Sequence, residues 1–158
     1  MHSDTTIMMR GPLPRIVELA ADVERWPEIL PHYRWVTLLS GGGDRKVVEM
    51  AARRGRIPLR WRAVQLVDRS ITPPVIVYRH IWGPTRGMDV AWTFRETPGG
   101  IHVSITHRFH PPWPLVGNMV TDYIIGPLFI EHIARLTLST IKEIVEREPE
   151  ATAGAGAS

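Results

Sequence analysis

The segment IHVSITHRF, residues 101–109, alternates apolar and polar side chains without a break. One side of it carries four apolar residues and one histidine: Ile101, Val103, Ile105, His107 and Phe109. A period of two over this length indicates a half-buried β-strand. One face of the strand should therefore pack against a core, and that core includes a histidine.

Upstream of this strand the chain has five more segments of strand character. They are Tyr33 to Ser40, Lys46 to Arg53, Arg56 to Val67, Val75 to Trp82 and Met88 to Glu96. Short turns rich in Gly and Pro separate them, and connections this short make neighbouring strands antiparallel. Thr5 to Arg10 predicts a first strand. Two short helices should follow it, one starting at Pro12 to Pro14 and one from Glu24 to Leu30.

Downstream the period changes to three and four between Leu115 and Arg147, which indicates a long helix with one apolar stripe. Gly126-Pro127 interrupts it, so we expect a kink or two helices in series, the first piece a candidate lid. A sheet with one apolar face must cover that face, and this helix is the one element long enough. The predicted fold is α+β: a curved seven-stranded antiparallel sheet around a long C-terminal helix, with two short helices after the first strand and an internal cavity.

The overall composition suits one soluble domain. A length of 158 residues predicts a single domain over residues 1–148, followed by a disordered Ala/Gly-rich tail over 149–158. The chain has no cysteine, no N-terminal apolar leader and no apolar run of about 18 residues, so we expect a cytoplasmic protein.

The chain also lacks the usual cofactor motifs. There is no phosphate-cradling loop, no dinucleotide fingerprint and no G-x-S-x-G elbow. His107 and His110 would face opposite sides of a strand, and Glu131-His132 lacks the second histidine of a helical zinc motif. We therefore expect neither a cofactor nor a metal site.

The segment DVERWPEILPHY, Asp22 to Tyr33, gives a more specific signal where the second short helix meets the sheet. Further matching features are Trp61, residues 83–88, Trp92 to Arg95, Gly99-Gly100, and Leu136, Leu138, Ile141 and Lys142 of the last helix. From about Thr6 to Glu148 the chain resembles the START-like (helix-grip, SRPBCC) superfamily, most of all its polyketide cyclase/dehydrase (aromatase/cyclase-like) branch.

The resemblance implies a helix-grip fold whose cavity binds a hydrophobic or aromatic small molecule. In that branch the protein shapes a poly-β-ketone chain and promotes aldol ring closure and dehydration. A tyrosine after the Trp-Pro helix corresponds to Tyr33. The branch also has an arginine four residues beyond a strand tryptophan, and the same count from Trp61 reaches Gln65, whose uncharged amide is a weaker stabiliser of an enolate.

Proton transfer is assigned to Tyr33, His80 and His107, since an imidazole in a dry pocket can act as a general base. The alternative for each histidine is a core side chain satisfied by one backbone or hydroxyl partner. Ligand contacts are predicted for eleven residues, of which the tryptophans are alternatively core filler. The eleven are Trp35, Met50, Trp61, Gln65, Tyr78, Trp82, Met88, Trp92, Tyr123, Phe129 and Ile133.

Five arginines gather around one predicted turn and the strand after it: Arg53, Arg54, Arg56, Arg60 and Arg62. Arg60 and Arg62 share one strand face, which reads most simply as a solvated outer face that prevents edge pairing. Alternatively, Arg53, Arg54 and Arg56 dock the protein, a monomer or homodimer, on an acyl carrier protein or an anionic membrane. Nucleic acid is not an expected partner, because no exposed aromatics interleave with these arginines.

Three functions remain open. The first is a cyclase or dehydratase, and the second is a non-catalytic carrier or chaperone for a quinone or other lipid. The third is an interaction or stress-response module without a small ligand, which an interior space below roughly 300 Å³ would favour.

Overall fold

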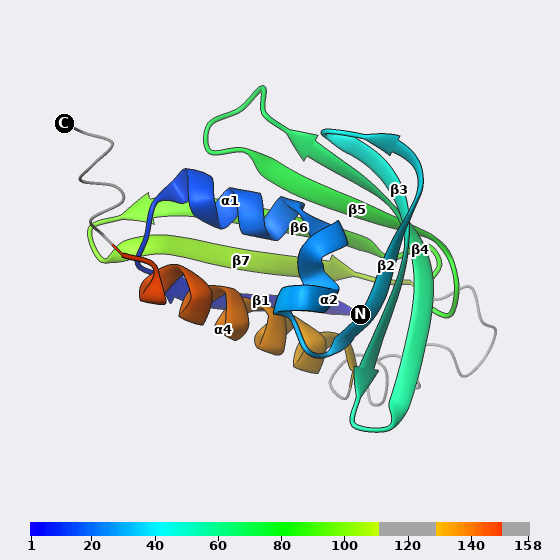
Figure 1. Ribbon diagram of the computed structural model, residues 1–158. Coiled ribbons are helices and arrows are strands. Elements are labelled where there is room, and N and C mark those ends of the chain that lie inside the picture. Colours follow the sequence, from blue (N-terminus) through cyan, green and yellow to red (C-terminus); the bar gives the residue numbers. More distant parts are fainter. Residues whose placement is uncertain (111–128, 150–158) are drawn as a thin grey trace.

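The computed structural model describes residues 1–110 and 129–149, shown in Figure 1. In chain order its elements are β1 (His2–Met9), α1 (Leu13–Ala21), the 3₁₀ turn η1 (Val23–Arg25), α2 (Trp26–Ile29), β2 (Tyr33–Gly42), β3 (Arg45–Arg54), β4 (Ile57–Asp68), β5 (Val75–Trp82), β6 (Asp89–Thr97), β7 (Gly100–Arg108) and α4 (Glu131–Arg147). This order confirms the predicted α+β fold.

The strands form one antiparallel sheet in the order β1-β7-β6-β5-β4-β3-β2. β1 and β2 thus form the two edges of the sheet. β1 pairs with the distant β7, while all other neighbouring strands are consecutive in the chain and joined by short turns. Figure 1 shows α1, α2 and α4 on one face of the sheet, with β2 to β4 curving around toward them. The sheet therefore has an inner face turned to the helices and an outer face without a covering element among the described residues.

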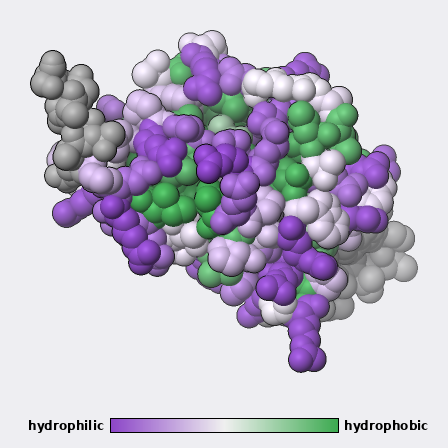
Figure 2. Space-filling view, viewed as in Figure 1, coloured by the Kyte–Doolittle hydropathy of each residue, from purple (hydrophilic) through white to green (hydrophobic). Residues whose placement is uncertain are grey.

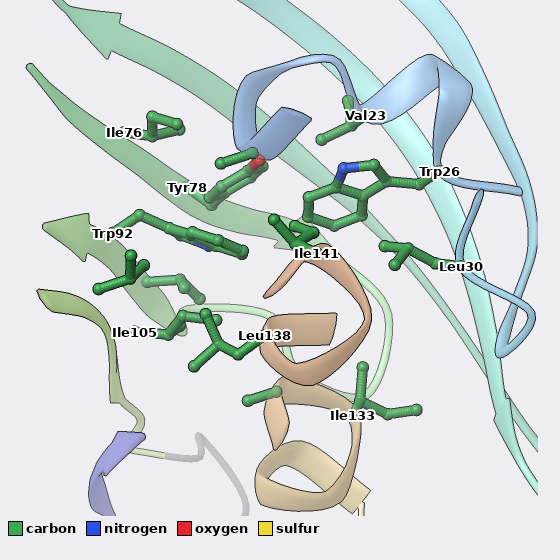
Figure 3. Packing of buried hydrophobic residues seen from close by; sticks show 14 of the residues in the cluster. Val23, Trp26, Leu30, Ile76, Tyr78, Trp92, Ile105, Ile133, Leu138 and Ile141 are labelled. Carbon is green, nitrogen blue, oxygen red and sulfur yellow. The ribbon is translucent and has the colours of Figure 1, made fainter. Parts of the chain in front are cut away.

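The core lies between the inner face and α4. The buried stripe of α4 consists of Ile133, Ala134, Thr137, Leu138, Ile141 and Val145. Figure 3 shows Leu138 and Ile141 projecting from α4 toward Trp92 of β6 and Trp26 of α2. At the far end Val145 lies so close to Gly11 that a Cβ there would clash with the Val145 Cγ1 atom. The apolar stripe predicted for the last helix is thus the side that packs on the sheet.

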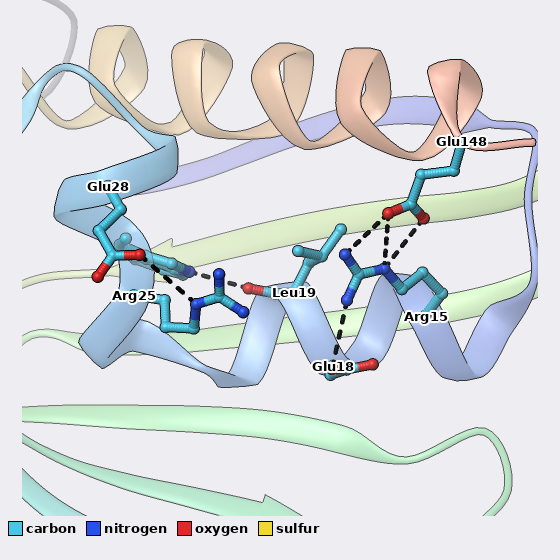
Figure 4. A network of polar contacts seen from close by, with 7 residues as sticks. Arg15, Glu18, Leu19, Arg25, Glu28 and Glu148 are labelled. Carbon is cyan, nitrogen blue, oxygen red and sulfur yellow. Dashed lines mark hydrogen bonds and ion pairs between the residues drawn. The ribbon is translucent and has the colours of Figure 1, made fainter.

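Polar contacts fix the short helices against α4 (Figure 4). The Arg15 guanidinium of α1 donates to the Glu148 carboxylate just beyond α4, at 2.8 to 3.0 Å. This contact lowers the pKa of Glu148. The Trp26 indole Nε1 donates to the Leu19 carbonyl at 2.9 Å, which ties α2 to α1. These contacts set the position of Trp26, a residue of the inner wall.

The bounds of the elements agree with the predicted ones to within a few residues, apart from differences in one strand and one helix. The first strand begins at His2 rather than Thr5, because β1 pairs with β7 along its whole length, from His2 opposite Arg108 to Met9 opposite Ile101. The predicted second helix is a 3₁₀ turn followed by α2. The long helix is present from Glu131, whereas its expected start and the Gly126-Pro127 interruption lie outside the described residues, as does the tail after Pro149.

Figure 2 shows hydrophilic side chains interspersed with smaller hydrophobic areas on the face that carries the helices. Several large apolar side chains elsewhere are exposed, Ile57 the most, at 63%. Within residues 1–110 and 129–149, no helix has the length and apolar character needed to cross a membrane.

Candidate functional site

A cavity of about 70 Å³ lies between the inner face of the sheet, α2 and α4. Its wall is mostly aromatic and aliphatic, and six of its side chains carry a hydroxyl or an imidazole: Tyr33, Tyr78, His80, Thr85, His107 and Thr137. No Asp, Glu, Lys or Arg belongs to the wall in the part of the chain that the structure describes. The polar groups come from four different elements and a loop, so only the folded sheet brings them together.

The cavity gathers most of the predicted site residues. All three predicted proton-transfer residues, Tyr33, His80 and His107, belong to its wall. Seven of the predicted ligand contacts do so as well: Met50, Trp61, Tyr78, Met88, Trp92, Phe129 and Ile133. Their role toward a ligand stays a prediction. Tyr123 lies outside the described residues.

Trp82 does not belong to the cavity wall, contrary to its prediction as a ligand contact in the cavity. Arg62 pairs with Trp82 and Ala63 pairs with His80, so Ile81 is an extra residue on β5. This irregularity reverses the alternation, as a β-bulge does. Trp82 is consequently 39% exposed on the outer face. The guanidinium carbons of Arg60 and Arg62 lie 5.0 and 4.7 Å from the centroid of its ring.

Trp35 is also absent from the wall, for the same kind of reason. Tyr33 pairs with Ala52 but Trp35 pairs with Ala51, so the register shifts between them. The side chain is half-buried outside the cavity, with the Arg34 guanidinium carbon 5.6 Å from its ring centroid. Trp35 also contributes a hydrogen bond to Glu49, whose pKa is lowered mainly by its hydrogen bond with Arg62.

Gln65 lies behind the wall rather than in it. Its side chain is fully buried, and its Nε2 donates to the Ala21 carbonyl and to the Tyr78 hydroxyl, both at 2.9 Å. The Oε1 atom is buried without a partner. Any influence of Gln65 on a ligand therefore passes through Tyr78, whose pKa is raised, chiefly by burial.

His80 is held on two sides. Its Nδ1 lies 2.6 Å from the Thr85 hydroxyl, and its ring stacks on Trp61 with 5.6 Å between centroids and 7° between planes. Burial, together with the nearby His107, lowers the pKa of His80 to about 3. The imidazole is therefore neutral at physiological pH.

His107 is 8% exposed, and its Nδ1 is buried without a hydrogen-bond partner. Burial lowers its pKa to about 4, against a small opposing effect of Asp4. Neither proposed alternative for a core histidine, a backbone or a hydroxyl partner, is present among the described residues. A neutral imidazole without a partner can accept a proton or a hydrogen bond from a molecule in the cavity.

Tyr33 belongs to a separate polar group at the α4 side. Burial raises the pKa of Tyr33, and a hydrogen bond with Thr137 opposes that rise. The Thr137 hydroxyl donates to the Ile133 carbonyl at 2.7 Å and lies 2.8 Å from His32 Nε2. Burial and the nearby His132 lower the pKa of His32 to about 4. Tyr33 thus presents a neutral hydroxyl, fixed by a helix residue.

Sequence reasoning did not select Trp26, His32, Thr85 or Thr137 as site residues. Thr137 left a signal, since it is a polar residue in the apolar stripe of the last helix. Thr85 left none, because its loop resembles any Gly-bounded turn. The only imidazoles in the described wall are those of His80 and His107. The described residues contain no cluster of three or more His, Asp or Glu that could hold a metal ion.

The family model for polyketide cyclase / dehydrase and lipid transport matches residues 12–124. A relative from Streptomyces halstedii, named "Putative polyketide cyclase", is 30% identical over 104 residues, which are 63% of this chain and 93% of the relative. The actinorhodin polyketide synthase bifunctional cyclase/dehydratase of Streptomyces coelicolor is 27% identical over 104 residues, covering 66% of this chain and 33% of that protein.

Solved structures show the same fold at low sequence identity. The Zhui aromatase/cyclase from Streptomyces sp. R1128 superposes with a TM-score of 0.77 at 18% identity, over 93% of this chain and 94% of that one. A START superfamily protein from Mycobacterium smegmatis gives a TM-score of 0.65 at 12% identity, over 92% and 97%. At these identities the comparison establishes the helix-grip architecture.

Proposed function

Because the chain belongs to the polyketide cyclase/dehydrase and lipid transport family, we propose that it promotes aldol ring closure and dehydration of a poly-β-ketone or similar aromatic precursor in its interior cavity. The relatives' names supply the reaction class. The cavity supplies neutral proton-handling groups on a largely apolar wall.

One observation carries the proposal: the imidazole of His107 stands at the cavity wall with a buried nitrogen that has no partner. Leaving a buried polar group unsatisfied costs about 1–3 kcal/mol. A side chain that only filled the core would be more stable as an apolar residue of similar size. The cost is explained if a substrate engages the imidazole.

The proposed reaction needs one base and one proton donor. His107 takes a proton from a carbon flanked by two carbonyl groups, which leaves an enolate. The enolate carbon attacks a second carbonyl of the same chain, a C–C bond forms, and the new alkoxide takes up a proton. Loss of that hydroxyl with a neighbouring hydrogen, as one water, gives the unsaturated ring. Holding the chain folded lowers the barrier by proximity, and the neutral Tyr33 hydroxyl serves as donor.

The volume of the cavity limits what enters without movement. About 70 Å³ is well below the roughly 300 Å³ of a typical small-molecule pocket, and by the criterion given above it favours a module without a ligand. The unpartnered imidazole argues against that reading. Met50 and Met88 are unbranched, adaptable side chains of the wall, so the proposal requires them to move when substrate binds.

The test compares His107→Gln with His102→Gln, a matched change on the opposite face of the same strand. Purified proteins are incubated with a linear poly-β-ketone surrogate, and cyclised products are quantified by mass spectrometry. The His107 variant should lose turnover by about 100-fold or more, the scale of general acid–base catalysis. The double variant of His80 and His107 should show none. Unchanged turnover in the double variant would refute the catalytic proposal.

Carriage of a lipid or quinone is the second candidate, favoured by the absence of charged side chains from the described wall. It needs no base. Native mass spectrometry of the protein purified from its own host separates the two. A co-purified isoprenoid or acyl lipid supports carriage, whereas an empty protein that cyclises the surrogate supports catalysis.

The same proposal includes a docking surface at the turn between β3 and β4, through which a partner delivers the substrate. Arg53 and Arg56 are exposed at the turn between β3 and β4, with the exposed Ile57 beside them. An acidic carrier protein or an anionic membrane would suit this surface. Binding to an acyl carrier protein should weaken with salt, and salt-insensitive binding would contradict electrostatic docking.

A further inference from the structure

We propose that Thr85 is a positioning residue that holds His80 as the Nε2–H tautomer, so that His80 donates a hydrogen bond to a carbonyl or enolate oxygen in the cavity. His80 is then the electrophilic partner of the base His107, rather than a second base. The inference rests on the proposed function and assigns one of its two histidines a different task.

Counting hydrogens supports this tautomer. The contact between His80 Nδ1 and Thr85 Oγ1, at 2.6 Å, contains one hydrogen. If it came from His80, the Thr85 hydroxyl hydrogen would need another acceptor, and the described residues offer none, although Thr85 is 1% exposed. If it comes from Thr85, both groups are satisfied. Nδ1 is then the acceptor, and the imidazole proton must be on Nε2.

The other ring nitrogen, Nε2, is left free for a ligand among the described residues. His80 belongs to the cavity wall, its Nδ1 is occupied by Thr85, and Nε2 has no partner among residues 1–110 and 129–149. Nor is Nε2 one of the fully enclosed unpartnered atoms, which are Gln65 Oε1 and His107 Nδ1. The ring cannot rotate freely, because it lies flat against Trp61. Its N–H is therefore fixed in direction before a ligand arrives, which is the condition for stabilising developing charge.

The loop between β5 and β6 is built to deliver Thr85. Gly83 and Gly87 have φ of +105° and +92°, values that favour glycine, at the two ends of the turn. The Gly87 amide donates to the His80 carbonyl at 2.8 Å, and the His80 amide donates to the Met88 carbonyl at 2.9 Å. A Cβ on Gly83 would lie 2.6 Å from the Arg60 carbonyl oxygen. The backbone thus folds tightly back on the histidine that it positions.

The assignment also accounts for the lack of a charged group. Gln65 donates one amide hydrogen to the Ala21 carbonyl and the other to the Tyr78 hydroxyl. No positively charged side chain belongs to the described part of the cavity wall. An enolate would therefore have to be stabilised by neutral donors. A neutral imidazole N–H in a dry site can fill that role, because burial lowers the pKa of His80 and keeps its ring uncharged.

The experiment measures the tautomer directly. Protein labelled with ¹⁵N at histidine is examined by long-range ¹H–¹⁵N correlation spectra, in which the two ring nitrogens of the neutral tautomers differ. Wild-type His80 should show a protonated Nε2 and an unprotonated Nδ1 from pH 6 to 8. Thr85→Val should raise the Nδ1–H share, while Thr85→Ser, which keeps the hydroxyl, should retain the wild-type pattern. Thr93→Val, an exposed threonine on the outer face of β6, is the matched control.

Kinetics provide the second readout. With the poly-β-ketone surrogate, Thr85→Val should lower kcat by about tenfold with little change in KM, because it misorients a donor worth about 100-fold, and Thr85→Ser should restore it. A protonated Nδ1 in the wild type, or an unchanged tautomer in Thr85→Val, would overturn the inference even if turnover is present. A correct tautomer in a protein that cyclises no surrogate would refute the proposed function and leave the positioning of His80 in place. The wild-type spectrum decides the tautomer even if Thr85→Val does not fold.

Discussion

Trp61 and Trp82 lie on opposite faces of two neighbouring strands, and each ring stacks on a nitrogen-bearing side chain. Trp61 is 6% exposed and lies on His80, which is neutral because burial lowers its pKa. Trp82 is 39% exposed and lies beneath the guanidinium groups of Arg60 and Arg62 on the outer face. On the inner face the tryptophan therefore packs on a neutral imidazole away from solvent, whereas on the outer face it packs on guanidinium groups in contact with solvent. Solvent access decides which one can take part in chemistry on an uncharged ligand.

The outer contact belongs to a short charged network. The Arg62 guanidinium donates to the Glu49 carboxylate at 2.8 Å, and this bond lowers the pKa of Glu49. Such groups interact through water and ions and contribute little to stability. The solvated outer face expected for Arg60 and Arg62 is thus present, and Trp82 covers part of it.

The largest expected difference between the two faces comes from truncating the tryptophans. Trp61→Ala leaves a hole in the wall and should lower the free energy of unfolding by about 3–5 kcal/mol. Trp82→Ala removes a half-exposed ring and should cost about 1 kcal/mol or less. Urea unfolding followed by circular dichroism measures both. Equal losses would show that the inner and outer contacts are energetically alike.

Acid should destabilise the inner face selectively. The pKa of His107 is about 4 when folded and about 6.5 when unfolded, so the unfolded state binds more protons below pH 6.5. The stability contribution is complete above pH 6.5 and is lost as pH falls through 4, by up to about 3 kcal/mol. Unfolding curves at pH 7, 5.5 and 4 measure the slope. His107→Leu should reduce the slope, and the remainder should come from His32 and His80, whose pKa values burial also lowers.

A smaller effect is expected at Gly83, which follows Trp82 in the chain and packs on the backbone of Arg60 and Trp61. Gly83→Ala forces a side chain into both a positive φ and a 2.6 Å contact, and should cost about 1–3 kcal/mol. Gly43→Ala, with positive φ but open space, isolates the strain alone. If thermal melts show equal losses, close packing at Gly83 contributes nothing.

The smallest effect should come from removing a charge outside. Arg62→Gln removes one cation–π contact and the bond to Glu49, and should cost less than about 1 kcal/mol, a loss that shrinks further in 0.5 M salt. Arg95→Gln, exposed on β6, serves as the baseline. A salt-independent loss of several kcal/mol would mean that the outer network is buried in solution, for instance in a complex.

Local pattern was a reliable guide wherever a strand is regular. Along β7 every second residue from Ile101 to Phe109 is buried, as the alternation predicted, because each step of an unbroken strand turns the side chain by half a revolution. The same rule failed at Trp82 and Trp35. One extra residue at Ile81, and a register shift after Tyr33, reversed the faces. Neither irregularity has a composition that distinguishes it from ordinary strand.

The residues of the site also differ in how well the sequence predicted them. His80 and His107 could be selected in advance because imidazoles among apolar and aromatic strand residues are uncommon, and Tyr33 was selected from the family resemblance. Thr85 could not, since its contact with His80 depends on how the loop folds back across the strand. Gln65 was selected as a ligand contact, but the sequence did not predict that its amide would donate to Ala21 and Tyr78 behind the wall. These partners are close in space through hydrogen bonds that the sequence spacing does not encode.

The amino-acid order alone specified seven strands, the late helix and which residues are apolar, because strand and helix periods are properties of a few consecutive residues. Tertiary structure decided the bulges, the 70 Å³ volume of the cavity and the pairing of each imidazole. Those features follow from how side chains of distant segments share a small dry space, where one added residue or one hydroxyl changes which group is left without a partner.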